Sequence, residues 1–299
     1  MNADLQHHIQ DFLAYGRQRG HSPNTLAAYR SALNKFAEYA AEQHVTSVSG
    51  VTRQLLRAYA AEIGGTLSPG GAHARLRPLK TFFMWLEDDE VLDRSPMRRV
   101  SLPKLPKHIL PAVTRADMGL LLAAAGESNH PLRDRAMLVL LYDTGVRASE
   151  LCGIRLDDLQ PGGRLDISRA KGSRARTVPV SRTALRHMNR YLKQERPQTE
   201  EPILFLSRTG DPMNRNTVKQ LLERLCKAAG TKRYSPHAFR RGFAVNYLRN
   251  SGDVFTLQRI LGHTTLEMTN HYVVMQVEDL KEAHRRASPV DSLRLGRED

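Results

Sequence analysis

The 299-residue sequence contains only two cysteines, Cys152 and Cys226, and neither lies in a CxxC pattern or at metal-ligand spacing. Both fall in predicted helices beside apolar residues, so we expect buried free thiols, as is typical of a reducing cytoplasm. No apolar run is long enough to cross a bilayer. Residues 1–6 also lack the basic and apolar segments of a secretory leader. We therefore expect a cytoplasmic protein.

Acidic residues are in the minority, since the sequence contains 31 aspartates and glutamates and 45 lysines and arginines. The formal net charge is +14, of which residues 1–110 carry +4 and the remainder carries +10. Such an excess favours a polyanionic partner such as nucleic acid. A membrane surface is the main alternative, but the sequence has no clear basic amphipathic anchor. A basic surface that is simply solvated also stays open.

A chain of this length most often forms two domains. Apolar residues recur at helical spacing through the first hundred positions, and short loops between amphipathic helices indicate a small bundle. The expected helices cover approximately residues 4–19, 23–40, 52–63 and 72–86.

Local signals mark the ends of these helices. Ser22 is a candidate N-cap, with Pro23 at the first helical position. Paired glycines at 64–65 and 70–71 are expected to bracket a loop. Pro78 is expected to kink the fourth helix or to delay its start.

Prolines and cations alternate in residues 94–113. Prolines keep such a segment stiff and extended, so we expect an interdomain linker whose cations could contact phosphates. The predicted organisation is a helical bundle at 1–93, a linker at 94–113 and a second domain at 114–299.

The second domain is predicted to be mainly α-helical with a small antiparallel β-sheet. Thr114 is a candidate N-cap, with Asp117 completing a near capping box. The apolar run at 135–142 predicts a buried helix that ends at Gly145. Two strands are expected to form a hairpin and a third to follow, at residues 164–169, 177–180 and 203–206.

Four short motifs of this domain supply cations, imidazoles and a phenol in a definite order. They occupy residues 144–151, 169–172, 235–240 and 261–272. The candidate functional residues within them are Arg147, Glu150, Lys171, His237, Arg240, His263 and Tyr272.

This order and these local contexts resemble the tyrosine recombinase (phage integrase) family, and most closely its short Xer-like members. The resemblance covers nearly the whole chain. It implies a SAM-like core-binding bundle and a C-terminal catalytic domain that form a C-shaped clamp on double-stranded DNA. It further implies a homotetramer on DNA, or a heterotetramer with a sister recombinase. The predicted bundle starts almost at residue 1, which favours a simple Xer-like, plasmid-resolving or transposon-borne enzyme over a larger integrase with an arm-binding domain.

The residue types themselves suit phosphoryl transfer. Two guanidiniums, such as those of Arg147 and Arg240, can clamp the non-bridging oxygens of a pentacoordinate phosphorane bidentately. His237 lies three residues before Arg240, so the two share one helical face. A phenol such as Tyr272 has a pKa of about 10 and needs cationic neighbours or a base before it can attack a phosphodiester.

Other roles follow from the resemblance alone. Tyr272 would be the nucleophile and Lys171 the general acid for the departing 5′ oxygen. His263 would donate to the scissile phosphate and shuttle protons, and His237 would assist the tyrosine. Glu150 would orient or buffer the cations.

Each of these residues also has an ordinary structural explanation. Arg147 and Glu150 could form a weak surface ion pair, and Lys171 could be a solvated turn residue. His263 could cap a helix or lie in the core, and Tyr272 could be a packed aromatic residue. It is the joint occurrence of all six catalytic candidates that favours the catalytic interpretation.

The candidate set contains no carboxylate pair suited to Mg²⁺, which argues against an RNase H-like transposase, and the sequence has no P-loop motif. We therefore predict a site-specific DNA recombinase that uses neither metal, cofactor nor ATP. Two alternatives remain. One is an enzyme like the type IB topoisomerases or telomere resolvases, and the other is a catalytically silent DNA-binding architectural protein.

Residues 277–284 are predicted to form a short helix that packs on a neighbouring protomer or on its own chain.

Overall fold

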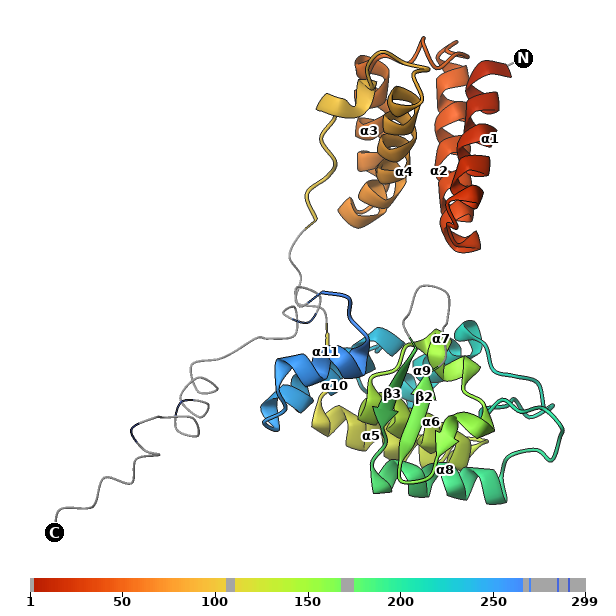
Figure 1. Cartoon of the computed structure of the whole chain (residues 1–299), viewed down its shortest axis with the longest axis vertical. Coiled ribbons are helices and arrows are strands. Elements are labelled where there is room, and N and C mark those ends of the chain that lie inside the picture. Colours follow the sequence, from red (N-terminus) through yellow and green to blue (C-terminus); the bar gives the residue numbers. More distant parts are fainter. Residues whose placement is uncertain are drawn as a thin grey trace. The chain divides into compact units, whose positions relative to one another are not determined.

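The computed structural model describes residues 3–105, 111–167 and 175–265, together with residues 269, 284 and 290. The chain divides into two compact units, Met1–Ile109 and Leu110–Asp299 (Figure 1). The predicted fold class, mainly helical with a small antiparallel sheet, is confirmed. Among the described residues, no helix combines the length and the apolar character needed to span a membrane.

The first unit is a bundle of four α-helices followed by a short 3-10 helix. Its core contains Phe12, Phe36, Phe82 and Phe83, which are all buried. Phe82 lies 5.5 Å from Phe12 and 5.1 Å from Phe83 between ring centroids, so aromatic edge contacts join α1 to α4. The elements are α1 (Ala3–Gln18), α2 (Pro23–Glu42), α3 (Arg53–Thr66), α4 (Pro69–Asp88) and η1 (Pro96–Arg99).

The predicted cap of α2 is confirmed, and a connection lies between the two glycine pairs as expected, although both pairs belong to the helices that flank it. Ser22 Oγ accepts a hydrogen bond from the Thr25 N–H at 3.1 Å, and Pro23 is the first helical residue. The residue pair 64–65 lies inside the last turn of α3, and 70–71 lies inside the first turn of α4. Because Ser68 caps α4, only two residues are left between these helices.

Helix α4 runs through Pro78 instead of starting near it. The helix begins at Pro69, nine residues earlier, so the expected start at residue 72 was too late. Pro78 itself is buried, and it packs with the rest of the apolar face of α4. Tertiary packing of that face outweighs the hydrogen bond that a proline cannot donate.

The beginning of the predicted linker is packed onto the first unit. Residues 96–99 form η1, which contacts α3 and α4, and Met97 is completely buried. Ser95 and Val100 are also buried. The apolar side chains at 97 and 100, overlooked among the prolines and cations, explain why this stretch is folded.

The second unit is built around α6. This helix contacts α5, α8 and α10, and most of its side chains are buried (Figure 1). Thr114 caps α5 by accepting the Asp117 N–H at 3.0 Å, as predicted. The helices are α5 (Arg115–Gly126), α6 (Pro131–Thr144), α7 (Ala148–Gly153), η2 (Leu156–Asp158), α8 (Arg182–Gln194), α9 (Arg215–Ala228), α10 (Pro236–Arg249) and α11 (Val254–Leu261).

The sheet of the second unit has three antiparallel strands in the order β1-β2-β3. The predicted pairing of two strands as antiparallel neighbours is confirmed, with Leu165 opposite Val178. The expected strand at 203–206 was wrong, because Ile203 and Leu206 form isolated bridges to two different segments. The strands are β1 (Leu159–Gln160), which was not predicted, β2 (Arg164–Ile167) and β3 (Arg176–Pro179).

Both cysteines lie in helices and are free, as predicted, although only one is fully buried. Cys226 on α9 is buried and accepts the Tyr234 N–H at 3.4 Å. Cys152 on α7 is only partly buried, and this burial raises its pKa to about 11. The thiol of Cys152 is therefore protonated and unreactive at neutral pH.

Candidate active site

The turn between α6 and α7 fixes the position of Arg147. Helix α6 ends at Gly145, whose φ of 62° lies in the left-handed region and whose N–H bonds to the Leu141 carbonyl at 3.1 Å. A Cβ at Gly145 would lie 2.5 Å from Phe243 and 2.9 Å from Leu261, so packing also requires a glycine there. Two residues later, Arg147 is the N-cap of α7.

Glu150 is a buried carboxylate that holds two arginines. Its Oε2 accepts the Arg147 backbone N–H at 2.8 Å, and its Oε1 accepts Arg147 Nη1 at 2.9 Å. Arg176, on β3, donates Nη1 and Nη2 to the two oxygens, each at 2.9 Å. Since the Glu150 side chain is fully buried, the weak surface ion pair considered above was wrong.

The electrostatics of Glu150 follow from these bonds. Burial alone would raise the pKa of Glu150, but hydrogen bonds from Arg176 and Arg147 and the charge of Arg176 lower it to about 2. The carboxylate is therefore ionised over the whole physiological pH range.

Arg176 has a role that the sequence did not suggest. Its Nε donates to the Ile260 carbonyl at 2.7 Å, and its Nη1 and Nη2 engage Glu150. Arg176 therefore ties β3 to α7 and to the end of α11. No local signal distinguishes it from neighbouring arginines, because its partners lie 26 and 84 residues away in the sequence.

Helix α10 carries His237 and Arg240 on one face. Ser235 is its N-cap and Pro236 its first residue, although the Ser235 side chain makes no capping bond. Arg240 is buried and donates Nη1 to the Gly145 carbonyl at 2.8 Å and Nη2 to the Leu261 carbonyl at 2.6 Å. Arg240 is thus fixed against the ends of both α6 and α11.

His263 follows the end of α11 directly. Helix α11 ends at Gly262, which has a φ of 66°, and the His263 N–H bonds to the Gln258 carbonyl at 3.1 Å. The buried ring is hydrogen-bonded through Nδ1 to Thr269 Oγ1 at 2.9 Å. Burial, followed by the charges of Arg240, Arg147 and Arg176, lowers the pKa of His263 to about 4.

His237 is exposed and lies in the same cationic field. Partial desolvation and then the charges of Arg240, Arg241 and Arg147 lower the pKa of His237 below its usual 6.5. Both imidazoles therefore favour the neutral form near pH 7, in which each ring can donate one N–H and accept one proton.

The described part of the chain brings five candidates into one cluster: Arg147, Glu150, His237, Arg240 and His263. Arg147 and Arg240 are joined through the α6–α7 turn, and Glu150 and His263 are joined through Arg176 and the end of α11. Lys171 and Tyr272 lie outside the described residues, as do residues 277–283. Their predicted roles stay predictions. The cluster combines several cations with one buried carboxylate, and this arrangement suits an anionic ligand.

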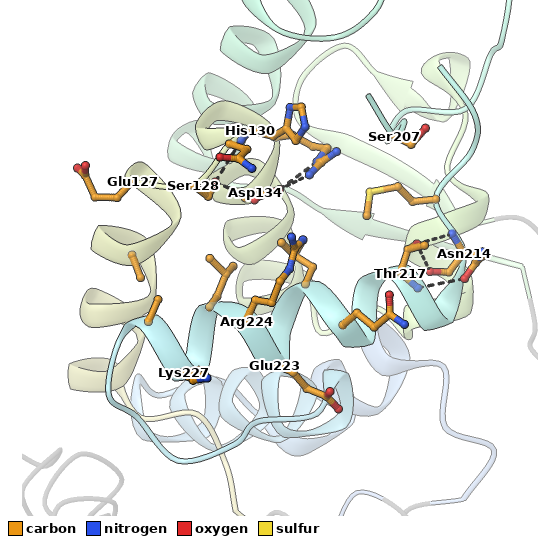
Figure 2. A pocket seen from close by; sticks show the side chains of 18 of the residues that line it. Glu127, Ser128, His130, Asp134, Ser207, Asn214, Thr217, Glu223, Arg224 and Lys227 are labelled. Atoms are coloured by element: carbon orange, nitrogen blue, oxygen red, sulfur yellow. Dashed lines mark hydrogen bonds and ion pairs between the residues drawn. The ribbon is translucent and has the colours of Figure 1, made fainter. Parts of the chain in front are cut away.

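The second unit also has a groove of about 1180 Å³ that contains none of the predicted site residues (Figure 2). It is lined by the α5–α6 connection, the 207–214 segment and α9. Asp134 in this groove is already engaged by its neighbours: Ser128 Oγ donates to Asp134 Oδ2 at 2.8 Å, and Arg133 Nε donates to Asp134 Oδ1 at 2.9 Å. We assign it no catalytic role.

Sequence comparison matches both units to one family. The profile described as "Phage integrase family" matches residues 112–278, and the one described as "Phage integrase, N-terminal SAM-like domain" matches residues 9–90. Tyrosine recombinase XerC 2 of Ralstonia nicotianae is 35% identical over 94% of this chain and 84% of its own length. Tyrosine recombinase XerC of Myxococcus xanthus is 32% identical over 94% of this chain and 95% of its own.

Solved structures share the fold. The Tn1549 transposon integrase, in complex with a circular intermediate DNA, aligns with a TM-score of 0.74 at 21% identity, over 93% of this chain and 98% of its own. The XerH site-specific recombinase bound to its difH substrate aligns with a TM-score of 0.70 at 21% identity, over 92% of this chain and 82% of its own. The predicted resemblance is confirmed, and the chain belongs to the tyrosine recombinases of the phage integrase family.

Proposed function

We propose that this protein is a site-specific DNA recombinase that cleaves and rejoins duplex DNA through a covalent 3′-phosphotyrosyl intermediate. The observation that carries the proposal is the cluster of Arg147, Glu150, Arg240 and His263 in a chain of the tyrosine recombinase family. Its relatives named above are tyrosine recombinases, and two neighbours of the same fold were solved on DNA.

The two arginines of the cluster bind the scissile phosphate. Glu150 orients the Arg147 guanidinium, and two carbonyls orient that of Arg240. Because these partners fix both side chains before DNA arrives, little reorganisation is needed when negative charge develops on the phosphorane. Arginine suits this role because its planar fork matches the geometry of phosphate oxygens.

The two imidazoles supply neutral donors. His263 is neutral near pH 7 because burial and three arginines lower its pKa, so it donates a hydrogen bond to a phosphate oxygen without adding a charge. His237, more exposed, assists the deprotonation of the attacking phenol.

Tyr272 is the proposed nucleophile and Lys171 the proposed general acid. Attack by the Tyr272 oxygen forms the phosphotyrosyl bond and breaks the bond to the 5′ oxygen, which takes a proton from Lys171. The free 5′-hydroxyl of a partner strand then attacks the phosphotyrosyl bond and releases Tyr272. Because the phosphotyrosine preserves the energy of the phosphodiester, this chemistry requires no ATP. The arginines stabilise the developing negative charge, which is the role that a metal would otherwise have.

The proposed assembly is a clamp on double-stranded DNA. Residues 1–93, extended by the packed residues 95–100, form the core-binding domain, and residues 114–299 form the catalytic domain. Four protomers, identical or shared with a sister recombinase, hold two sites during strand exchange. We place this activity in the cytoplasm, where the chromosome or plasmid substrate would be found.

Covalent trapping in host cells tests the proposal without knowledge of the target site. Cells expressing the wild type, Tyr272→Phe or Tyr15→Phe are lysed under denaturing conditions, and DNA that stays attached to the purified protein is sequenced. Tyr15 is a suitable control because it is a partly exposed tyrosine of the first unit. We expect adducts at one or a few discrete sequences with the wild type and Tyr15→Phe, and none with Tyr272→Phe.

The other outcomes separate the alternatives. Adducts scattered over the genome would favour an enzyme that relaxes DNA like a type IB topoisomerase. Equal adducts with Tyr272→Phe would contradict the nucleophile assignment. Absence of adducts from every variant, while a known covalent enzyme is trapped in the same lysate, would favour a DNA-binding protein without activity.

A further inference from the structure

Helix α8 exposes a straight row of cations. Its buried face, formed by Ala184, Met188 and Tyr191, packs in the core around α6. At a rise of about 1.5 Å per residue, cations four positions apart follow one another every ~6 Å along the opposite face. This row, called the α8 strip, consists of Arg182, Arg186 and Arg190 at every fourth position and Lys193 three residues further on, and all four are exposed.

The charges of the α8 strip are not neutralised within the described part of the chain. None of the ion pairs there involves its four residues. Arg186 and Arg190 donate instead to neutral partners, Thr183 Oγ1 at 3.2 Å and Gln194 Oε1 at 3.3 Å. Like charges four residues apart destabilise a helix by roughly 0.2–0.5 kcal/mol per pair. The free protein is therefore less stable with the strip than without it.

The field of the strip acts on a neighbouring histidine. His187, which is partly buried on α8, has its pKa lowered by desolvation and then by Arg135 on α6 and by Arg186 and Arg190 on α8. Every charged group that acts on His187 in this way is a cation. A bound polyanion would offset this repulsion.

The α8 strip lies apart from the candidate active site. In Figure 1, α8 forms one edge of the second unit and α7, whose N-cap is Arg147, lies at the opposite edge. A straight duplex held at Arg147 and Arg240 therefore does not explain these cations.

The exposed face of α8 has the character of a phosphate-binding surface. Thr183 and Asn189 are the other exposed residues between Arg182 and Arg190, so this stretch offers no exposed apolar anchor. Protein interfaces depend on buried aromatic and apolar anchors, whereas DNA backbones are bound by rows of basic and polar side chains. An acidic protein partner is therefore the less favoured occupant.

We propose that the α8 strip binds the sugar-phosphate backbone of a second segment of duplex DNA, independently of sequence, while the candidate active site holds the first. The choice of DNA as the polyanion rests on the proposed function. The strip would bring in flanking DNA or another duplex, and each of its arginines would contact one phosphate.

Photocrosslinking locates DNA at each surface separately. The probe p-benzoylphenylalanine replaces either Asn189, which is exposed next to Arg190 of the α8 strip, or Ser149, which is exposed on α7 between Arg147 and Glu150. Each full-length protein is irradiated with a labelled 40-base-pair duplex of arbitrary sequence at low salt. We expect DNA adducts from both positions.

Substitutions within the strip then test its role. In the triple variant Arg182→Gln, Arg186→Gln and Arg190→Gln, we expect the position-189 adduct to fall at least tenfold and the position-149 adduct to change less than twofold. For the position-189 adduct, we plot the logarithm of the yield against the logarithm of the salt concentration. In the glutamine variant this slope should become shallower by about 3, because three phosphate contacts are lost and each contributes roughly 0.9. The matched triple substitution to lysine should retain the adduct, and so should Arg208→Gln, which removes an exposed cation elsewhere.

The two probes keep the two proposals separate. A position-149 adduct without a position-189 adduct would overturn the role of the strip and leave an acidic protein as its occupant. A position-189 adduct that the glutamine variant retains would also overturn it. A position-189 adduct without a position-149 adduct would support the strip and contradict the proposed active site.

Discussion

Glu150 is the side chain on which the geometry of the site depends. It is buried, it bonds to Arg147 and Arg176, and its pKa of about 2 lies below the usual 4.5. A lowered pKa stabilises the folded state above the unfolded pKa, and this stabilisation is lost as the pH falls from about 4.5 towards 2. The shift corresponds to a contribution of about 3 kcal/mol to the free energy of unfolding.

We predict that Glu150→Gln lowers the free energy of unfolding of the second unit by about 3 kcal/mol at pH 7, because it leaves Arg147 and the nearly buried Arg176 without their anion. The difference from the wild type should disappear near pH 2. Circular dichroism follows the helices of both units, and the fluorescence of Trp85, the only tryptophan, reports on the first alone, so a dichroism transition without a matching Trp85 change belongs to the second unit. Glu223→Gln is the control, since its pair with Arg233 is exposed and should contribute less than about 1 kcal/mol. Equal stability of wild type and Glu150→Gln at pH 7 would contradict this account.

His263 gives a second prediction at this scale. Its pKa of about 4 lies below the usual 6.5, so the imidazole is neutral through the range in which the enzyme works. Its contribution to stability is complete above about pH 6.5 and is lost as the pH falls towards 4. Nuclear magnetic resonance titration of the ring, assigned with His263→Gln, should give a midpoint near 4. A midpoint at 6 or above would show that the ring is neither buried nor close to the arginines.

At the scale of secondary structure elements, the turn between α6 and α7 positions the site. We predict that Gly145→Ala destabilises the second unit by roughly 2–4 kcal/mol, because it combines strain at positive φ with contacts under 3 Å to Phe243 and Leu261. DNA cleavage should fall with it, since the Gly145 carbonyl holds Arg240. Thermal unfolding and a cleavage assay measure both effects.

Gly119→Ala is the matched control for this turn. Gly119 lies inside α5, where a Cβ would meet nothing within 4 Å. Alanine there should stabilise the helix by up to about 1 kcal/mol. If Gly145→Ala behaved like Gly119→Ala, the turn would not have the proposed role.

The elements also show which features a sequence can predict. The caps at Ser22 and Thr114 and the helix end at Gly145 were predictable because each depends on contacts within a few residues. The passage of α4 through Pro78 depends on distant packing partners, and so was not predicted. In the candidate site, residue types and order pointed to Arg147, Arg240 and His263, which the structure brings close together. The burial of Glu150 and the bonds of Arg176 became evident only from β3, α7 and α11 together.

For the whole molecule, the net charge of +14 predicts strongly salt-dependent binding to DNA. If a clamp neutralises about 6–10 phosphates, affinity should fall by about 10³–10⁵ between 50 and 200 mM salt. Fluorescence anisotropy with a labelled duplex measures this slope. A salt dependence of the affinity weaker than that expected for two or three phosphate contacts would contradict the proposed clamp on DNA.

The proposed mechanism requires that one tyrosine, Tyr272, becomes covalently linked to DNA. The trapped adduct is digested with nuclease and trypsin, and its peptides are analysed by mass spectrometry. Trypsin is expected to release residues 260–281, a peptide whose only tyrosine is Tyr272. We predict a nucleotide 3′-phosphate on that residue. A nucleotide on any other tyrosine, or an adduct through another residue type, would contradict the account.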